Sequence, residues 1–132
     1  MEPTRLFSII SWILLPTVMF GGYALMGLIV KGSVLTPLKE VFFRAGHGHA
    51  GSLLVLSLVY YQYLGGTGLS DGIQWLACFT VLVGVLAVAG GFFLHMSKAE
   101  PQRTSPGIAL TSVGALLMSL AIAILVWGVV AS

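Results

Sequence analysis

Four long apolar stretches, separated by short polar connections, constrain this 132-residue chain more than any other feature of its sequence. A helix needs about 20 mainly apolar residues to cross the hydrocarbon core of a bilayer. The stretches that reach this length cover about residues 6–30, 45–64, 73–95 and 107–130. Helices are expected, because an unpaired backbone group in hydrocarbon costs several kcal/mol. The sequence therefore predicts an all-α, polytopic membrane protein, with residues 1–132 forming a single domain of four transmembrane helices.

The composition favours a membrane protein over a soluble one. Hydrophobic residues make up 58% of the chain and charged residues 8%, with a mean hydropathy of +1.03, whereas soluble domains contain roughly 45–50% apolar residues. Cys78 is the single cysteine, so no intrachain disulfide is expected. The sequence contains no basic stripe and no glycine-rich phosphate loop. We therefore expect no nucleic acid partner, but the lipid bilayer, and either a homo-oligomer or a larger membrane complex.

The basic residues predict the orientation of the helices. Five of the six follow the first or the third apolar stretch, and only Arg5 falls on the opposite side of the membrane. These five residues are Lys31, Lys39, Arg44, Lys98 and Arg103. Because basic residues are enriched in cytoplasmic loops, we expect a multi-pass protein of the cell membrane, of the bacterial inner-membrane kind, with both termini outside. Tryptophans and tyrosines near the outer ends of the stretches agree with this orientation as interfacial anchors.

Small residues at spacings of three or four predict close packing between the helices. In lipid, such residues let helix backbones approach, so that van der Waals contact holds them together. The predicted packing residues are Gly84, Ala87 and Gly91 in the third stretch, and Ala115, Ser119 and Ala123 in the fourth. We therefore expect a compact bundle assembled through these faces.

Three histidines are the most chemically versatile side chains of the sequence, and the predicted topology places all of them at the cytoplasmic face. His47 and His49 open the second helix, and His95 ends the third. The short glycine-rich connection between these helices makes them neighbours, so the three imidazoles are expected to converge. Imidazole binds haem iron, copper and zinc. The sequence therefore predicts a haem or transition-metal site at this end of the bundle.

Three further residues extend this candidate site. Met96 follows the last histidine, and its thioether suits copper or an axial position on haem. Arg44 and Lys39 are candidates for binding haem propionates or another anion at the inner surface. The His-x-His spacing argues against full convergence, because residues i and i+2 of an ideal helix diverge by about 200°. Glycines at positions 46 and 48 would have to loosen the first turn for both rings to point inward.

Three functional classes stay open at this point. The first binds haem, copper or zinc through the histidines, in a redox or accessory role. The second is a non-catalytic structural or accessory subunit without a cofactor, in which the histidines hydrogen-bond carbonyls or headgroups, and it is equally compatible with the sequence. The third is a small transporter or channel that forms by oligomerisation, because four helices leave little room for an internal pathway. No Ser/His/Asp or Cys/His set is legible, so an enzyme is disfavoured.

The segment 43–51, Phe-Arg-Ala-Gly-His-Gly-His-Ala-Gly, together with Gly-Phe-Phe-Leu at 91–94, resembles small uncharacterised four-helix integral membrane proteins of bacteria. That similarity spans most of the chain and implies no activity. The His-x-His pair is also similar to one in small haem-copper-oxidase-like membrane proteins, which implies His47 and His49 as haem or metal ligands, although the rest of that pattern is absent. Arg44 and His47 match an Arg-x-x-His element of trimeric membrane glutathione and eicosanoid enzymes, whose following Asn and Glu are missing here.

Overall fold

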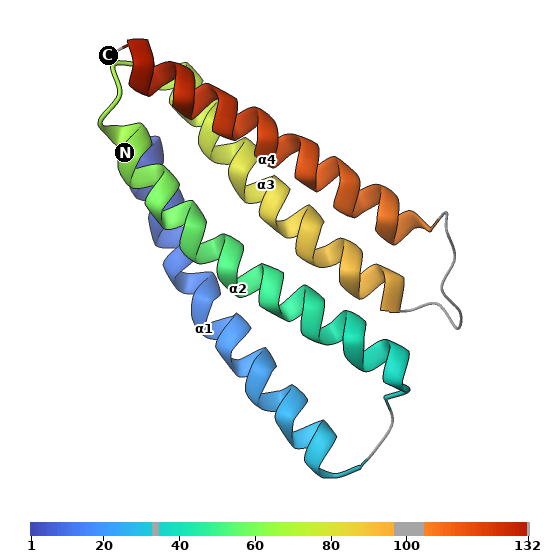
Figure 1. The fold of residues 1–132 in the computed structure, drawn as a ribbon. Helices are drawn as coiled ribbons and strands as arrows, with labels where there is room; N and C mark the ends of the chain where they lie inside the picture. The colour runs from blue at the N-terminus through green and yellow to red at the C-terminus, as the bar shows by residue number, and fades with distance from the viewer. Residues whose placement is uncertain (33–34, 97–104, 132) are drawn as a thin grey trace.

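The computed structural model describes residues 1–32, 35–96 and 105–131, with the exception of the Met96 side chain. Within these residues the chain forms four helices and no strand (Figure 1). They are α1 (Pro3–Val30), α2 (Pro37–Gly65), α3 (Asp71–Met96) and α4 (Pro106–Ala131). The predicted all-α four-helix bundle is therefore confirmed.

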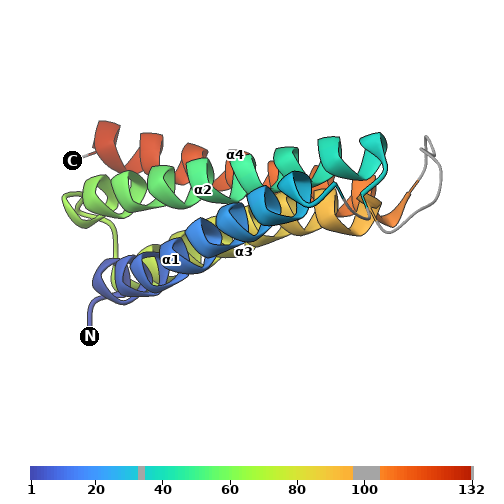
Figure 2. The same cartoon turned by 90° about the horizontal axis from the view of Figure 1, so that it is seen from below.

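Consecutive helices run antiparallel, so that both chain termini lie at one end of the bundle (Figure 1). We call this the terminus end, and it also holds the connection between α2 and α3. The opposite end holds His47, His49 and His95, and we call it the histidine end. Figure 2 shows α1 and α2 on the near side of the bundle, with α3 and α4 behind them.

The central helix of the bundle is α3, which packs against each of the other three. In the most apolar 18-residue stretch of each helix, 56% of α3 is buried, compared with 6% of α1 and 17% of α4. The helix α1 is peripheral and leaves the bundle toward the histidine end, since every residue from Met26 to Gly32 is exposed. The order of burial among these three helices follows from position, because α3 contacts all the other helices, whereas α1 and α4 each contact two.

Small residues repeated every seven positions hold α3 and α4 together. Ala77, Gly84 and Gly91 on α3 are buried, as are Gly107, Gly114, Ala121 and Gly128 on α4. A Cβ atom added at Gly107 would lie 2.5 Å from the carbonyl oxygen of Gly91, and one at Gly114 would lie 2.8 Å from that of Gly84. The two backbones are therefore in direct contact, as small-residue interfaces in lipid allow.

The packing face of α4 differs from the one that the sequence predicted. Gly84 and Gly91 lie in the α3–α4 contact and Ala87 is buried, but Ala115, Ser119 and Ala123 are exposed on α4. The glycines occupy the contact because they permit a closer backbone approach than alanine or serine. The sequence of α4 contains two series of small residues, one repeated every seven positions and one every four. The prediction rested on the series at spacing four.

The helix α2 begins at Pro37, eight residues before the expected position near 45. The Thr36 side chain caps it by accepting a hydrogen bond from the Lys39 backbone N–H at 3.4 Å, and Pro37 follows at a position where proline favours helix initiation. Glu40 and Arg44 then pair across one turn at 2.6 Å. The Thr-Pro start signal therefore places the charged residues inside the first turns of the helix.

Three of the helices, α1, α3 and α4, are long and apolar enough to cross a membrane. The helix α2 is not among them, although we expected four such segments. It carries Lys39, Glu40 and Arg44 in its first turns, and histidines, tyrosines and a glutamine further along. These polar residues lower its mean hydropathy below that of the other three helices.

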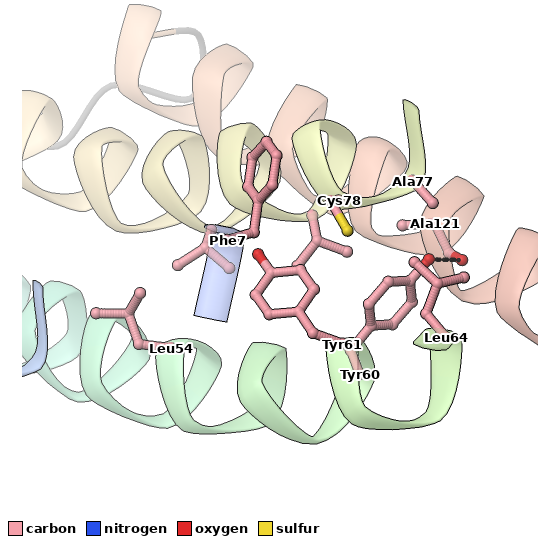
Figure 3. Close-up of a cluster of buried hydrophobic side chains, with 10 residues drawn as sticks. Phe7, Leu54, Tyr60, Tyr61, Leu64, Ala77, Cys78 and Ala121 are labelled. Atoms are coloured by element: carbon pink, nitrogen blue, oxygen red, sulfur yellow. Dashed lines mark hydrogen bonds between the residues drawn. The ribbon is translucent and has the colours of Figure 1, made fainter. Parts of the chain in front are cut away.

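The buried core lies nearer the terminus end and is built from α2 and α3 with one side chain each from α1 and α4 (Figure 3). Phe7 packs against Tyr61 and Trp75, with ring centroids 6.1 and 5.8 Å apart. The hydroxyl group of Tyr60 donates a hydrogen bond of 2.8 Å to the Ala121 carbonyl oxygen, which joins α2 to α4 (Figure 3). The core therefore contains side chains from all four helices.

We expect the substitution Gly114→Ala to lower the free energy of unfolding by about 1–3 kcal/mol, because the added methyl group would overpack a backbone contact. Its Cβ would lie 2.6 Å from the Val88 backbone nitrogen, which cannot move without displacing α3. Thermal melting of the detergent-purified protein, followed by circular dichroism, measures the change. Gly48→Ala is the matched control, since nothing lies within 4 Å of a Cβ at Gly48, and it should be neutral or stabilising by up to about 1 kcal/mol. Equal melting temperatures for the two variants would contradict the close-contact interpretation.

Candidate functional site

The first histidine of α2 packs against α1. The His47 ring lies over two adjacent glycines, and a Cβ atom at Gly22 would come within 2.7 Å of its Nε2 atom. The ring also stacks on Phe43, one turn earlier, with centroids 6.5 Å apart and an angle of 26° between the planes. The Gly21-Gly22 pair therefore provides the space in α1 that this half-buried imidazole occupies.

The second histidine faces α3 and is exposed. Its ring stacks on Phe92 of α3, with centroids 4.7 Å apart and an angle of 29° between the planes. The Nδ1 atom of His49 lies 2.8 Å from the Ala45 carbonyl oxygen, one turn earlier in the same helix. Because a carbonyl oxygen accepts, Nδ1 carries the proton, and the lone pair of the neutral ring is on Nε2.

The third histidine joins the end of α3 to the start of α4. His95 and Ser105 are both buried, and the Nδ1 atom lies 2.6 Å from the serine hydroxyl oxygen. The same oxygen accepts a hydrogen bond of 3.2 Å from the Ile108 backbone N–H, so Ser105 is the N-cap of α4. Phe42 of α2 covers the imidazole, with ring centroids 4.3 Å apart.

The predicted convergence of the three imidazoles is not found. Among the residues that the structure describes, no three His, Cys, Asp or Glu side chains lie close enough together to hold a metal ion. Each ring has a separate setting, because His47 faces α1, His49 stacks on α3, and His95 pairs with Ser105 at the start of α4. Met96 ends α3, but its side chain is outside the described residues. The guanidinium group of Arg44 is already paired with Glu40, and Lys39 makes no ion pair with any described side chain.

A cleft that sequence reasoning missed lies at the terminus end, between the first turns of α1 and the last turns of α2. It has a volume of about 550 Å³, and polar groups form about half of its walls. Its lining residues are Thr4, Arg5, Ser8, Tyr61, Gln62, Gly65 and Gly66. The only signal in the sequence was the series of hydroxyl residues at 4, 8 and 11, whose spacings of four and three put them on one face of α1.

That hydroxyl series continues inward to a buried pair. The hydroxyl oxygens of Ser11 and Ser57 are 3.2 Å apart, and both residues are almost fully buried. Ser57 donates its hydrogen to the Leu54 carbonyl oxygen at 2.7 Å, so Ser11 must be the donor between the two serines. Tyr61 lies close to both, but its buried hydroxyl group makes no hydrogen bond with any part of the chain that the structure describes. Polar groups thus extend along the α1–α2 contact from the cleft into the bundle.

The chain matches no protein family, no curated protein and no solved structure.

We expect Ser105→Ala to destabilise the bundle by about 1–3 kcal/mol, because the substitution removes a helix cap and the partner of a buried imidazole. Chemical or thermal unfolding in detergent measures this effect. Ser112→Ala is the control on the same helix, since Ser112 is exposed and donates no side-chain hydrogen bond to a described residue; it should change stability by less than about 0.5 kcal/mol. A Ser105→Ala protein as stable as this control would show that the pair with His95 contributes nothing.

Proposed function

We propose that this chain is an integral membrane protein that crosses the lipid bilayer with both termini outside. The observation that carries the proposal is the apolar outer surface of the bundle. Large hydrophobic side chains are exposed on every helix, among them Phe20 on α1, Phe79 on α3 and Leu116 on α4. A soluble monomer rarely exposes more than a few hundred Å² of contiguous apolar surface, whereas lipid covers such a surface without cost.

The lengths of the helices support the same proposal. Helices of 26 to 29 residues extend about 39–44 Å at 1.5 Å per residue. A bilayer measures about 40–45 Å when its headgroup regions are included. The end turns of each helix would therefore lie among the lipid headgroups. Lys31, Lys39 and Arg44 at the histidine end, against Arg5 at the other, favour a cytoplasmic histidine end.

We further propose a non-catalytic role for the protein, as an accessory or interaction subunit within the membrane. The settings of the histidines support this role. The His47 and His95 rings each pack between two helices, and the His49 ring stacks on a side chain of the neighbouring helix α3. His47 fills the space over the α1 glycines, and His95 connects α3 to the cap of α4. The exposed small residues Ala115, Ser119 and Ala123 of α4 would suit a homo-oligomer or a larger complex, since they let another helix approach.

Cysteine labelling tests the topology. Native Cys78 is fully buried and therefore gives little background. In spheroplasts treated with a membrane-impermeant maleimide, we expect Glu2→Cys to be labelled and Lys31→Cys to be protected until the membrane is broken. Labelling of Lys31→Cys alone would invert the orientation.

Alkaline carbonate extraction of the same membranes supplies the control for insertion. An integral protein stays in the pellet, because the treatment removes only peripheral proteins. Release of the chain into the supernatant, with both cysteines labelled in intact spheroplasts, would contradict the membrane proposal.

A second candidate function is the binding of haem or a transition metal at the histidine end. One observation favours it: the hydrogen bond from His49 Nδ1 to the Ala45 carbonyl leaves an exposed ring with its lone pair on Nε2. Metal-binding histidines commonly donate their second nitrogen to a carbonyl in this way. His49 would then be the principal ligand, and the His49 ring of a second copy would complete the coordination, since His47 and His95 of the same chain face other neighbours.

An absorption spectrum with metal analysis of the detergent-purified protein tests this candidate. If a cofactor is bound through His49, the wild type shows a Soret band or stoichiometric metal, and His49→Ala loses at least about 90% of it. Lys39→Ala serves as the control, because it removes a nearby side chain without removing a ligand. A colourless, metal-free wild type that binds neither added haemin nor zinc would exclude the cofactor and leave the accessory role.

A further inference from the structure

The geometry of the terminus-end cleft points to a binding site for a phosphate group, carried by an anionic lipid or supplied as free phosphate. This inference rests in part on the proposed membrane location, which decides between the two sources. The cleft lies between the first turns of α1 and the last turns of α2, and none of the three histidines contributes to it. It is therefore separate from the haem or metal candidate.

An unpaired cation lines the cleft. Arg5 is exposed and makes no ion pair with any side chain that the structure describes. Glu2 and Asp71, the acidic residues described near this end, do not line the cleft. A guanidinium group presents several N–H donors in a planar fork, which matches the oxygens of a phosphate. The charge of the cleft thus favours an anion over a cation or a metal ion.

The other polar groups of the cleft include suitable donors. The Gln62 amide and the Thr4 hydroxyl lie in its wall, and neither donates a side-chain hydrogen bond to a described residue. The Ser8 hydroxyl, in contrast, gives its hydrogen to the Thr4 carbonyl oxygen at 2.7 Å. The helix α1 starts without a side-chain cap, so the positive end of its dipole adds to the preference for an anion near its first turn.

The depth and shape of the cleft favour a headgroup phosphate as the source. Both helix ends lie where headgroups are expected if the bundle spans a bilayer. A Cβ at Gly65 would lie in ordinary van der Waals contact with the Thr4 hydroxyl oxygen, at 3.5 Å, so a larger side chain at this position would extend into the cleft. An anionic lipid could place its phosphate beside Arg5 while its acyl chains run along the apolar surface of α1.

Native mass spectrometry of the full-length, detergent-purified protein tests the site with dioleoylphosphatidylglycerol. We expect Arg5→Gln to weaken the binding of this lipid by about tenfold, as the loss of one charge-assisted contact implies. Gly65→Leu should weaken it as well by filling the cleft, without a change of charge. Lys31→Gln is the matched control, since it removes the same charge at the other end of α1, and it should leave the affinity unchanged.

Inorganic phosphate in a thermal-shift experiment distinguishes the sources. Stabilisation of the wild type, but not of Arg5→Gln, by inorganic phosphate alone would assign the site to free phosphate. Stabilisation by the lipid alone would assign it to a headgroup. Equal behaviour of wild type, Arg5→Gln and Lys31→Gln toward both probes overturns the site. Two results together would separate the anion site from the membrane proposal. If alkaline carbonate releases the chain from membranes, and Arg5→Gln still abolishes the thermal stabilisation by phosphate, the membrane proposal fails and the anion site stands.

Discussion

The backbones of α3 and α4 approach so closely at Gly91 and Gly107 that a methyl group on either would collide with the carbonyl oxygen of the other. Contacts of this kind gain dispersion energy along the whole helix, which in lipid replaces the hydrophobic effect as the force between helices. Each glycine weakens its own helix by about 1 kcal/mol relative to an alanine at the same position. The interface therefore exchanges local helix stability for contact between the helices.

The remaining structure is arranged around this pair. Because α4 covers one side of α3, the other helices pack on the sides that remain, and polar contacts join them. Tyr60 links α2 to α4 through the Ala121 carbonyl, and the Ser11–Ser57 pair links α1 to α2. Hydrogen bonds between membrane helices contribute modestly, about 0.6 kcal/mol on average. Their main effect here is to fix which faces meet, since a rotated helix would lose the Tyr60–Ala121 and Ser11–Ser57 hydrogen bonds.

The sequence determined the helices well because the hydrophobic stretches are long and the connections short. It located the start of α2 poorly, since the apolar pattern begins later than the helix, and Thr36 with Pro37 was the better signal. The glycines of α4 were harder to choose, because small residues at spacings of four and of seven coexist and only the partner helix decides between them. Convergence of the histidines could not be decided at all. It depends on which neighbour each ring faces, and that is a property of the assembled bundle.

The position of α2 connects these features. Both candidate sites involve this helix, since His47 and His49 lie in its first half and the cleft lies beside its last turns. A helix of this kind is expensive to expose to hydrocarbon. If the bundle spans a bilayer as proposed, packing between α1 and α3 shelters the polar side chains of α2 at mid-depth, and its two ends reach the depth of the headgroups. On that placement the charged residues of α2 lie where water, lipid headgroups or a partner can reach them, and Ser57, Tyr60 and Tyr61 bring hydroxyl groups into the bundle.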